Sequence, residues 1–394
     1  MEVKPGYKQT EVGVIPEEWE VNVLGKGLAE RPRYGINAAA VPYSDTLPVY
    51  IRITDISEDG RFSPDKHVSV KSELSGGYYL SDGDLVFART GASVGKSYRY
   101  NPNDGPLVYA GFLIRIRPDT QKLLPDFVAA YVTTGNYWRW VRLMSMRSGQ
   151  PGINGNEYSQ LPIPCPPLPE QRAIATALSD VDGLLGGLDR LIAKKRDLKQ
   201  AAMQQLLTGQ TRLPGFHAEW EVKRLGDLAS VSKGTQLHSS ETDEGGKFAH
   251  LNGGITPSSY THKSNTDGNT IAISEGGNSC GFVQFMTEPY WCGGHCYSVI
   301  PSGVDNLFLY HALKGQQSAI MGLRVGSGLP NVQKTGLLDF KIELPATLPE
   351  QTAIAEVLTE MDGELAVLEQ RREKTRALKQ AMMRELLTGQ TRLV

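Results

Sequence analysis

One helical segment occurs twice in this chain. Residues 168–213 and 348–393 align without a gap at an offset of 180, and 27 of the 46 aligned positions are identical. Each copy begins with Leu-Pro-Glu-Gln and ends with Leu-Leu-Thr-Gly-Gln-Thr-Arg-Leu. Agreement over this length is not a chance event, so the chain must fold as two cycles of one plan.

A shorter repeat lies ahead of each variable region. Residues 17–25, EEWEVNVLG, align with residues 218–226, AEWEVKRLG, so Trp19 corresponds to Trp220. Between the shared parts the two regions look unrelated, which suggests one frame used for two different recognition tasks. The chain is therefore divided into a first variable domain, 1–167, a first conserved helix, 168–213, a second variable domain, 214–347, and a second conserved helix, 348–394.

The repeated segment carries the start and stop signals of a long α-helix. Pro169 and Pro349 stand at its start, each followed by a glutamate that the positive end of the helix dipole favours. Gly209 and Gly389 follow the last apolar pair and suit a C-terminal cap. From 170 to 207 the first copy would be roughly 57 Å long, at about 1.5 Å per residue.

Apolar residues recur along both copies in alternating steps of four and three, the spacing of a coiled-coil seam. A helix with such a stripe needs a partner, and we expect the two copies to pair antiparallel about a pseudo-two-fold axis. The alternative is that each helix packs only on its own domain. The expected fold class is α+β, with two mixed α/β domains joined by two long antiparallel coiled-coil helices. The predicted pairing residues are Ile174, Leu178, Val181, Leu185, Leu188, Ile192, Ile354, Leu358, Met361, Leu365 and Leu368.

Both variable domains combine short strands with at least one helix. Turn residues separate runs rich in β-branched and aromatic side chains, a pattern typical of strands. We expect strands at 49–53, 84–89 and 112–118 with a helix at 125–134, and strands at 270–274 and 295–301 with a helix at 306–315.

Composition and charge describe an ordinary globular protein. Hydrophobic residues make up 40% and charged residues 21%, and the net charge is −2, which argues against a protein that coats polyanions. No apolar run approaches the roughly 18 residues of a membrane span, and the N-terminus lacks the apolar core of a signal peptide. Four unevenly spaced cysteines give no disulfide framework. We therefore expect a cytoplasmic protein with reduced thiols and no membrane partner.

Two motifs suggest other chemistry but depart from what that chemistry needs. Residues 89–97, RTGASVGKS, resemble a phosphate-binding Walker loop, yet only three residues separate Gly91 from Gly95 where four are required. A second cluster, Cys292, His295 and Cys296 with Cys280 upstream, has irregular spacing for a zinc site, and buried cysteines are the simpler interpretation. No familiar catalytic motif is found, which favours a binding subunit.

Aromatic and basic residues alternate at one further place, in Trp138, Arg139, Trp140 and Arg142. Such a cluster could face a nucleic acid, where aromatic rings stack on bases and arginines meet phosphates. Core packing of the tryptophans with solvent-exposed arginines is an equal alternative.

Taken together, these features resemble the specificity subunits of type I restriction-modification systems. The resemblance covers nearly the whole chain and is carried by the two LPEQ-to-LLTG helices, by GVIPEEW, by DLVFARTGASVGK with AGFLIRIRP, and by LNGGITPSSY, ISEGGNSCGFV and WCGGHCYSVI. It implies two target-recognition domains that read the halves of a bipartite, asymmetric site on double-stranded DNA, with the paired helices setting the spacer.

The resemblance also implies partners. Modification methyltransferase subunits, two of them, would carry S-adenosylmethionine and methylate adenine, and a restriction subunit would cleave DNA using ATP. Neither reaction would take place in this chain, so no catalytic residue, metal or cofactor is assigned to it.

Bases are read in the major groove by side chains such as Arg, Asn, Gln and Lys, while backbone amides and basic residues hold phosphates. On this basis the candidate DNA-binding residues of the first domain are Arg33, Tyr34, Asn37, Arg52, Arg89, Ser93 and Lys96. Those of the second domain are Lys233, Gln236, Asn252, Lys263, Asn278 and His295.

Two other classes of function compete with DNA recognition. One is an NTPase that uses the loop from Gly91 to Ser97. The other is a non-enzymatic coiled-coil scaffold or RNA-binding adaptor, for which comparable affinity for RNA and for a DNA target would be the sign.

Overall fold

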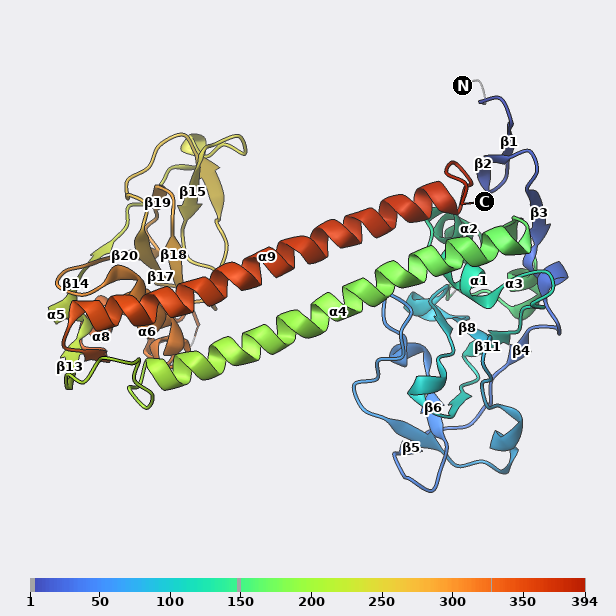
Figure 1. Cartoon of the computed structure of the whole chain (residues 1–394), viewed down its shortest axis with the longest axis horizontal. Helices are drawn as coiled ribbons and strands as arrows, with labels where there is room; N and C mark the ends of the chain where they lie inside the picture. Colours follow the sequence, from blue (N-terminus) through green and yellow to red (C-terminus); the bar gives the residue numbers. More distant parts are fainter. Residues whose placement is uncertain (1–3, 147–149, 327, 394) are drawn as a thin grey trace. The chain divides into compact units, whose positions relative to one another are not determined.

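The computed structural model describes residues 4–146, 150–326 and 328–393. Its contacts group into two units, unit 1 (residues 1–187 and 372–394) and unit 2 (residues 188–371). Both boundaries fall inside a long helix, so each unit holds one half of each repeated helix together with one variable domain (Figure 1).

The two repeated segments form helices of equal length, as the sequence predicts. Helix α4 spans Leu168–Leu206 and helix α9 spans Leu348–Leu386, 39 residues each. Gly209 and Gly389, just beyond the helix ends, both have a φ of 67°. This left-handed conformation is the one that favours glycine after a helix.

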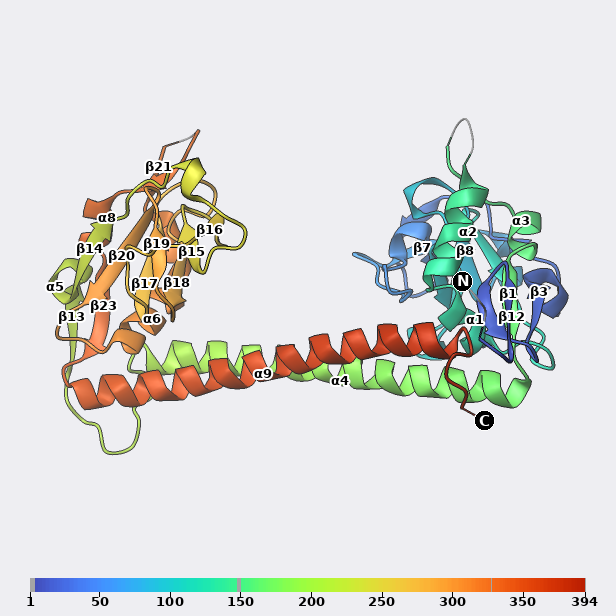
Figure 2. The same cartoon turned by 90° about the horizontal axis from the view of Figure 1, so that it is seen from above.

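The helices run antiparallel, and each unit contains the evidence by itself. In unit 1 the C-terminal half of α9 lies along the N-terminal half of α4 (Figures 1 and 2), and Lys379 Nζ bonds Asp182 Oδ1 at 2.6 Å. In unit 2 Lys199 makes the same bond to Asp362. Each of these two pairs is the other shifted by 180 positions, as a pseudo-two-fold arrangement requires.

Apolar seam residues differ in what they pack against. Leu185, Leu188 and Ile192 are buried along the middle of α4, and Leu365 is buried on α9. The seam residues nearer the helix starts join the domain cores instead. These are Ile174 and Leu178 in the core of unit 1, and Ile354 and Leu358 in that of unit 2, with Met361 packed beside it. Val181 and Leu368 are half-buried. Each helix therefore packs both on its partner helix and on a domain.

Unit 1 contains two four-stranded sheets, with orders β4-β11-β8-β9 and β10-β6-β7-β5, and two two-stranded pairs. Strands β10 and β6 are parallel, and the remaining pairs are antiparallel. The strands are β1 (Tyr7–Thr10), β2 (Gly13–Pro16), β3 (Glu20–Val23), β4 (Arg33–Tyr34), β5 (Ala40–Pro42), β6 (Val49–Ile51), β7 (Val68–Val70), β8 (Leu85–Ala88), β9 (Ser97–Arg99), β10 (Leu107–Tyr109), β11 (Leu113–Ile116) and β12 (Pro162–Cys165); the short helices are α1 (Pro125–Tyr131), α2 (Gly135–Ser145) and α3 (Gly155–Ser159).

Unit 2 repeats the principal sheet with the order β14-β20-β17-β18, beside a three-stranded sheet β16-β15-β19 (Figure 2). Its parallel pair is β15 with β19, the counterpart of β6 with β10. The strands are β13 (Trp220–Arg224), β14 (Ala229–Lys233), β15 (Phe248–Leu251), β16 (Ser259–Thr261), β17 (Thr270–Ser274), β18 (Val283–Met286), β19 (Tyr290–Cys292), β20 (Cys296–Pro301), β21 (Arg324–Val325), β22 (Asn331–Val332) and β23 (Lys341–Pro345); the short helices are α5 (Leu225–Leu228), α6 (Asn306–Gly315), α7 (Gln317–Gly322) and α8 (Lys334–Leu338).

All the strands and helices expected in the variable domains are present, with shorter bounds at several ends. The expected strand 49–53 stops at Ile51, because Arg52 caps a 3₁₀ turn through Asp55. The expected helix 125–134 ends at Tyr131, and Thr134 then caps α2. Among the described residues, none of the helices combines the length and the hydrophobicity needed to cross a bilayer.

Candidate nucleic-acid interface

Unit 1 has a hollow of about 660 Å³, which we call hollow 1. It lies where strands β4, β6 and β8 end and where the turn before β11 begins. Its polar and aromatic lining residues are Tyr34, Asn37, Tyr50, Arg52, Thr54, Arg89 and Phe112. Four of these, Tyr34, Asn37, Arg52 and Arg89, were candidates from sequence, so the fold brings together residues that are up to 55 positions apart.

Side chains in hollow 1 are held by specific contacts. The guanidinium of Arg89 lies 4.8 Å from the centre of the Tyr34 ring, and the Tyr34 hydroxyl accepts a hydrogen bond from the Gly155 amide at 3.1 Å. Arg52 forms an ion pair with buried Asp55 at 2.6 Å. Among the described residues no carboxylate lies within ion-pair distance of Arg89. Arg89 therefore offers donors to a ligand in a fixed orientation.

Unit 2 has a hollow of about 570 Å³, hollow 2, at the corresponding strand ends. Its polar lining residues are Lys233, Asn252, Glu275, Asn278, Ser279, His295 and Asn331. Lys233, Asn252, Asn278 and His295 were candidates from sequence. Glu275 contacts two of them: its carboxylate forms an ion pair with Lys233 Nζ at 2.5 Å and lies 3.5 Å from His295 Nδ1.

The two hollows have the same backbone frame. The amide of Arg89 donates to the Phe112 carbonyl at 3.0 Å, and the amide of Glu275 donates to the His295 carbonyl at 2.9 Å. At the facing edge, the Gly35 amide donates to Leu113, just as that of Gly234 donates to Cys296. A frame shared to this detail defines equivalent positions in the two units.

Glycine is required at two of those positions by close packing of backbone. A Cβ on Gly35 would lie 2.1 Å from the Ala110 carbonyl oxygen, and one on Gly234 would lie 2.3 Å from the Cys292 carbonyl oxygen. Any side chain there would push the turn away from the neighbouring strand.

The side chains at equivalent positions are different. From the strand registers, the pairs are Tyr34 with Lys233, Asn37 with Gln236, Arg52 with Asn252, Arg89 with Glu275, and Phe112 with His295. One frame thus presents two chemically unlike surfaces.

The other candidates lie outside the two hollows. Arg33 is exposed and stacks 4.8 Å over Tyr78. Lys96 pairs with Glu58 at 2.7 Å, and Ser93 belongs to the 3₁₀ turn Gly91–Ser93. In unit 2, Gln236 lies beside Gly294 next to hollow 2, whereas Lys263 pairs with Glu241 and stacks over Trp291.

Several residues of the hollows are absent from the sequence-based candidates, among them Phe112 and Glu275. Phe112 is 60% exposed and His295, its equivalent, is 62% exposed, which is unusual for phenylalanine beside a buried strand. Glu275 is an acid, a residue type outside the Arg, Asn, Gln and Lys on which the candidates were based. The signal that could have found both is the alignment of the two domains through their glycine-flanked turns, which sequence identity does not reveal.

The alternative chemistries find no structural support. The loop from Gly91 to Gly95 leads into strand β9, whereas a Walker loop leads into a helix. Within residues 4–146, 150–326 and 328–393 there is no group of three or more His, Cys, Asp or Glu side chains placed to hold a metal ion. Trp138 and Trp140 pack against the core of unit 1, which favours the packing interpretation of that cluster.

The repeated motif itself forms a lock between the start of one helix and the tail of the other. In unit 1 buried Glu170 of LPEQ accepts hydrogen bonds from Arg392 of the final TRL, at 2.9 Å for its Nη2, and from Trp19 Nε1 at 3.0 Å. In unit 2 Arg212 bonds Glu350 at 2.6 and 2.7 Å. The motif thus ties each helix end to the domain of its own unit.

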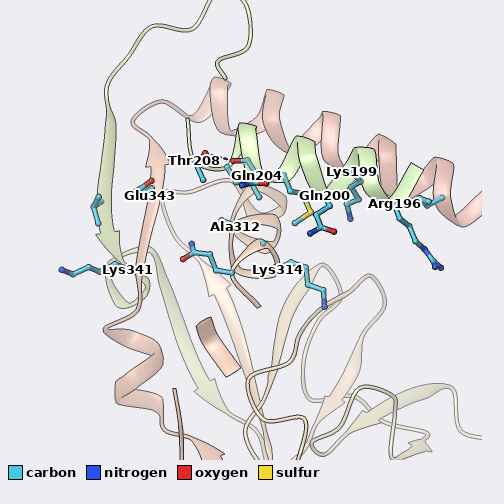
Figure 3. Close-up of a pocket in the computed structure, with 15 residues that line it drawn as sticks. Arg196, Lys199, Gln200, Gln204, Thr208, Ala312, Lys314, Lys341 and Glu343 are labelled. Carbon is cyan, nitrogen blue, oxygen red and sulfur yellow. Dashed lines mark hydrogen bonds between the residues drawn. The ribbon is translucent and has the colours of Figure 1, made fainter. Parts of the chain in front are cut away.

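A larger groove of about 890 Å³ lies in unit 2 between α4, α6 and β23 (Figure 3). Four cations line it, Arg196, Lys199, Lys314 and Lys341, with one carboxylate, Glu343; Arg196 also pairs with Glu369 and Lys199 with Asp362, both on α9. Burial lowers the pKa of Lys314, whose ammonium donates to the Val283 carbonyl at 2.7 Å and lies 4.0 Å from the Phe282 ring. Lys341 and the apolar side chains that line the groove remain accessible to a partner.

Comparison with known proteins decides the family. The model of the type I restriction modification DNA specificity domain matches twice, at residues 41–192 and 217–376. The chain belongs to this family. Both matches of the specificity domain extend into a long helix, so each contains most of a variable domain and part of α4 or α9.

Similar proteins match nearly the whole chain. A protein of Methanocaldococcus jannaschii that bears the name type I restriction enzyme MjaX specificity subunit is 29% identical over 98% of this chain and 97% of its own. The S subunit of the M. genitalium type I restriction-modification system has the same fold, with a TM-score of 0.71 and 17% identity over 98% of both chains. A chain from structural work on the assembly of the type I R-M system gives a TM-score of 0.54 at 18% identity, over 96% of this chain and 99% of that one.

Proposed function

We propose that this chain is the DNA-specificity subunit of a type I restriction-modification system. The first domain (1–167) reads one part of a two-part DNA site through hollow 1, and the second domain (214–347) reads the other part through hollow 2. The paired helices set the number of unspecified bases between them. The chain would work in the cytoplasm, where its DNA is.

One observation carries the proposal: two hollows share a backbone frame yet present different side chains at four equivalent positions. A protein that reads one repeated sequence would need the same side chains twice. A protein that reads an asymmetric site needs one frame and two side-chain sets, because bases are distinguished by donor and acceptor patterns in the major groove. Membership of the specificity-domain family points to the same function.

Partner subunits dock on the helices in this proposal. The groove of unit 2 supports it, since exposed Val222 and half-buried Met203 line the same groove as Lys341 and Arg196. An apolar floor beside the ammonium of Lys341 fits an amphipathic segment of a methyltransferase subunit that carries an acidic side chain. Methylation, which needs S-adenosylmethionine, and cleavage, which needs ATP, would then belong to the methyltransferase and restriction subunits. No catalytic residue or cofactor is assigned to this chain.

The experiment is to produce the chain with its methyltransferase subunits and to map methylated adenines over a host genome by long-read sequencing. We expect one bipartite motif with two unlike half-sites and a fixed spacer. Exchange of residues 14–167 for another first domain should change only one half-site.

Three results would contradict the proposal. Methylation that ignores both half-sites would remove the specificity role. A domain exchange that alters both half-sites at once would remove the assignment of one reader to each. Equal affinity of the complex for RNA and for its duplex target would favour an adaptor.

A further inference from the structure

Three equivalent positions meet at the mouth of each hollow. In unit 1 they hold Tyr34, Arg89 and Phe112, and in unit 2 they hold Lys233, Glu275 and His295. The frame hydrogen bonds fix the backbone of Arg89, Phe112, Glu275 and His295, the Arg89 guanidinium stacks on Tyr34, and the Lys233 ammonium is bonded to Glu275. We call these two sets triad 1 and triad 2.

Triad 1 presents a cation that no acid neutralises. Arg89 rests on the Tyr34 ring at 4.8 Å, and that ring is itself fixed by the bond from the Gly155 amide. Among the described residues only Arg52 brings a second charge into hollow 1, and Asp55 already pairs with it. Arg89 therefore keeps its donors for a ligand, in an orientation set before the ligand arrives.

Triad 2 inverts the charge at the same position. Glu275 is 13% exposed and accepts hydrogen bonds from Lys233 at 2.5 Å and from the Tyr297 hydroxyl at 3.2 Å. Burial raises the pKa of Tyr297 to about 12, so this hydroxyl stays a donor. Both hydrogen bonds fall on Oε1, and Oε2 lies 3.5 Å from His295 Nδ1, so the Glu275 carboxylate holds Lys233 and faces His295.

We infer that these triads determine which base each domain accepts, a deepening that rests on the proposed function. In unit 1 Arg89 is the specificity-determining residue and reads a guanine. In unit 2 Glu275 is a positioning residue that aims Lys233 and His295 at the base edge.

The assignment of guanine follows from donor geometry. An arginine presents two parallel N–H groups that match the O6 and N7 acceptors of guanine, and no other base offers two acceptors there. A phosphate contact would need no stacking platform, because the phosphate backbone carries no sequence information. The platform of Tyr34 points to base reading.

The test of triad 1 uses Arg89→Ala and Arg89→Gln in the full complex with its methyltransferase, against duplexes with each base of the first half-site replaced in turn. Arg89→Ala should reduce discrimination at one guanine by about 10-fold or more and leave the second half-site unchanged. Arg89→Gln should move the preference at that base toward adenine, whose N6 and N7 suit an amide. Arg61→Ala, an exposed arginine outside the hollow, is the matched control.

Two outcomes would overturn the assignment of Arg89. One is an unchanged first half-site in Arg89→Ala. The other is a uniform loss of affinity across all duplexes, which is the signature of a phosphate contact. If Arg89→Ala does not fold, Arg89→Lys, which keeps the charge but not the paired donors, decides between the same outcomes.

For triad 2 the variant is Glu275→Gln, with Glu241→Gln as the control because Glu241 also pairs with a lysine but lies away from the hollow. Glu275→Gln should broaden base preference in the second half-site by about 10-fold while the melting temperature matches that of the control. A purely structural role would lower the melting temperature and keep the preference. Failure of the proposed function would look different, since wild-type complex would then read neither half-site.

Discussion

At the residue scale, the buried carboxylate of Glu170 shows what the repeated motif does. Its two oxygens accept hydrogen bonds from Arg392 and Trp19, which come from opposite ends of the chain. The same position in unit 2, Glu350, receives Arg212, but Trp220 Nε1 is buried without a partner among the described residues. The lock is therefore more complete in unit 1.

Glu170→Ala should lower the free energy of unfolding by about 2 kcal/mol, because it leaves Arg392 and the Trp19 N–H without their acceptor. This loss is small for the removal of one partner of a buried ion pair, because Arg392 is 28% exposed and water can reach it. Denaturant unfolding followed by tryptophan fluorescence measures it. Glu18→Ala, which removes the exposed second partner of Arg392, should cost about 0.5 kcal/mol or less, and an equal loss in both variants would contradict the lock.

A second residue makes stability depend on pH. Burial lowers the pKa of His311 from 6.5 to about 4, against the opposing pull of Asp362. Between pH 6.5 and pH 4 the imidazole is protonated in the unfolded chain but not in the folded chain. The contribution of His311 to the free energy of unfolding is therefore fully present above pH 6.5 and decreases as the pH falls below it. Between pH 7 and pH 5 the loss should be about 2 kcal/mol from this residue.

His311→Leu should flatten that dependence, at the cost of the bond to Thr359. The measurement is the free energy of unfolding at pH 7 and at pH 5 in both proteins. His217→Leu, at an exposed position, should keep the wild-type slope. A wild-type slope in His311→Leu as well would show that other groups cause the pH dependence.

Individual site residues were only partly predictable. Side-chain type pointed to Arg89 and Lys233, because these are residues that bind DNA. It could not point to Glu275 or Phe112, whose place in the hollows depends on backbone hydrogen bonds between strands far apart in sequence. Side-chain type also could not show that Lys263 and Lys96 form ion pairs with glutamates of neighbouring loops.

At the scale of elements, the helices were predictable and the sheets were not. Local signals fix α4 and α9: a proline at the start, a seam of fixed period and a glycine at the end. Strand positions followed from apolar runs, but their order did not, because the parallel pair β6 with β10 joins residues more than 50 positions apart. Pairing at that distance is decided by packing, which no local pattern records.

A glycine inside a long helix and a glycine beyond the end of one give opposite expectations. Gly389→Ala should destabilise by about 1–3 kcal/mol, since its φ is 67° and a Cβ would lie 2.6 Å from the Pro16 ring. Gly183→Ala, inside α4 with no atom within 4 Å of the new Cβ apart from its chain neighbours and the backbone of its own helix, should stabilise by about 0.5–1 kcal/mol. Thermal unfolding of both variants checks this, and a stabilising Gly389→Ala would refute the docked tail.

At the scale of the whole molecule, unit 1 contains both ends of the chain and unit 2 is one continuous segment between them. Residues 372–394 belong to unit 1 although residues 188–371 separate them from the rest of it. Deleting the last helix turn would therefore damage the first domain, not the second. The same division marks two points, after Gly187 and after Arg371, where the helices pass from one unit to the other.

Those two points allow a test of the helices as a ruler. Seven residues inserted after Gly187 and seven after Arg371 keep the heptad phase of both helices and leave the contacts inside each unit unchanged. Each helix grows by about 10.5 Å, which corresponds to about 3 base pairs at roughly 3.4 Å each. We expect methylated sites with both original half-sites and a spacer longer by about that number. Insertion into α4 alone shifts one helix against the other, so it should lower stability and give no new spacer. An unchanged spacer in the double insertion would contradict the proposal that the helices set the spacer length. The variant leaves every residue proposed to read DNA unchanged, so altered base reading could not explain that result.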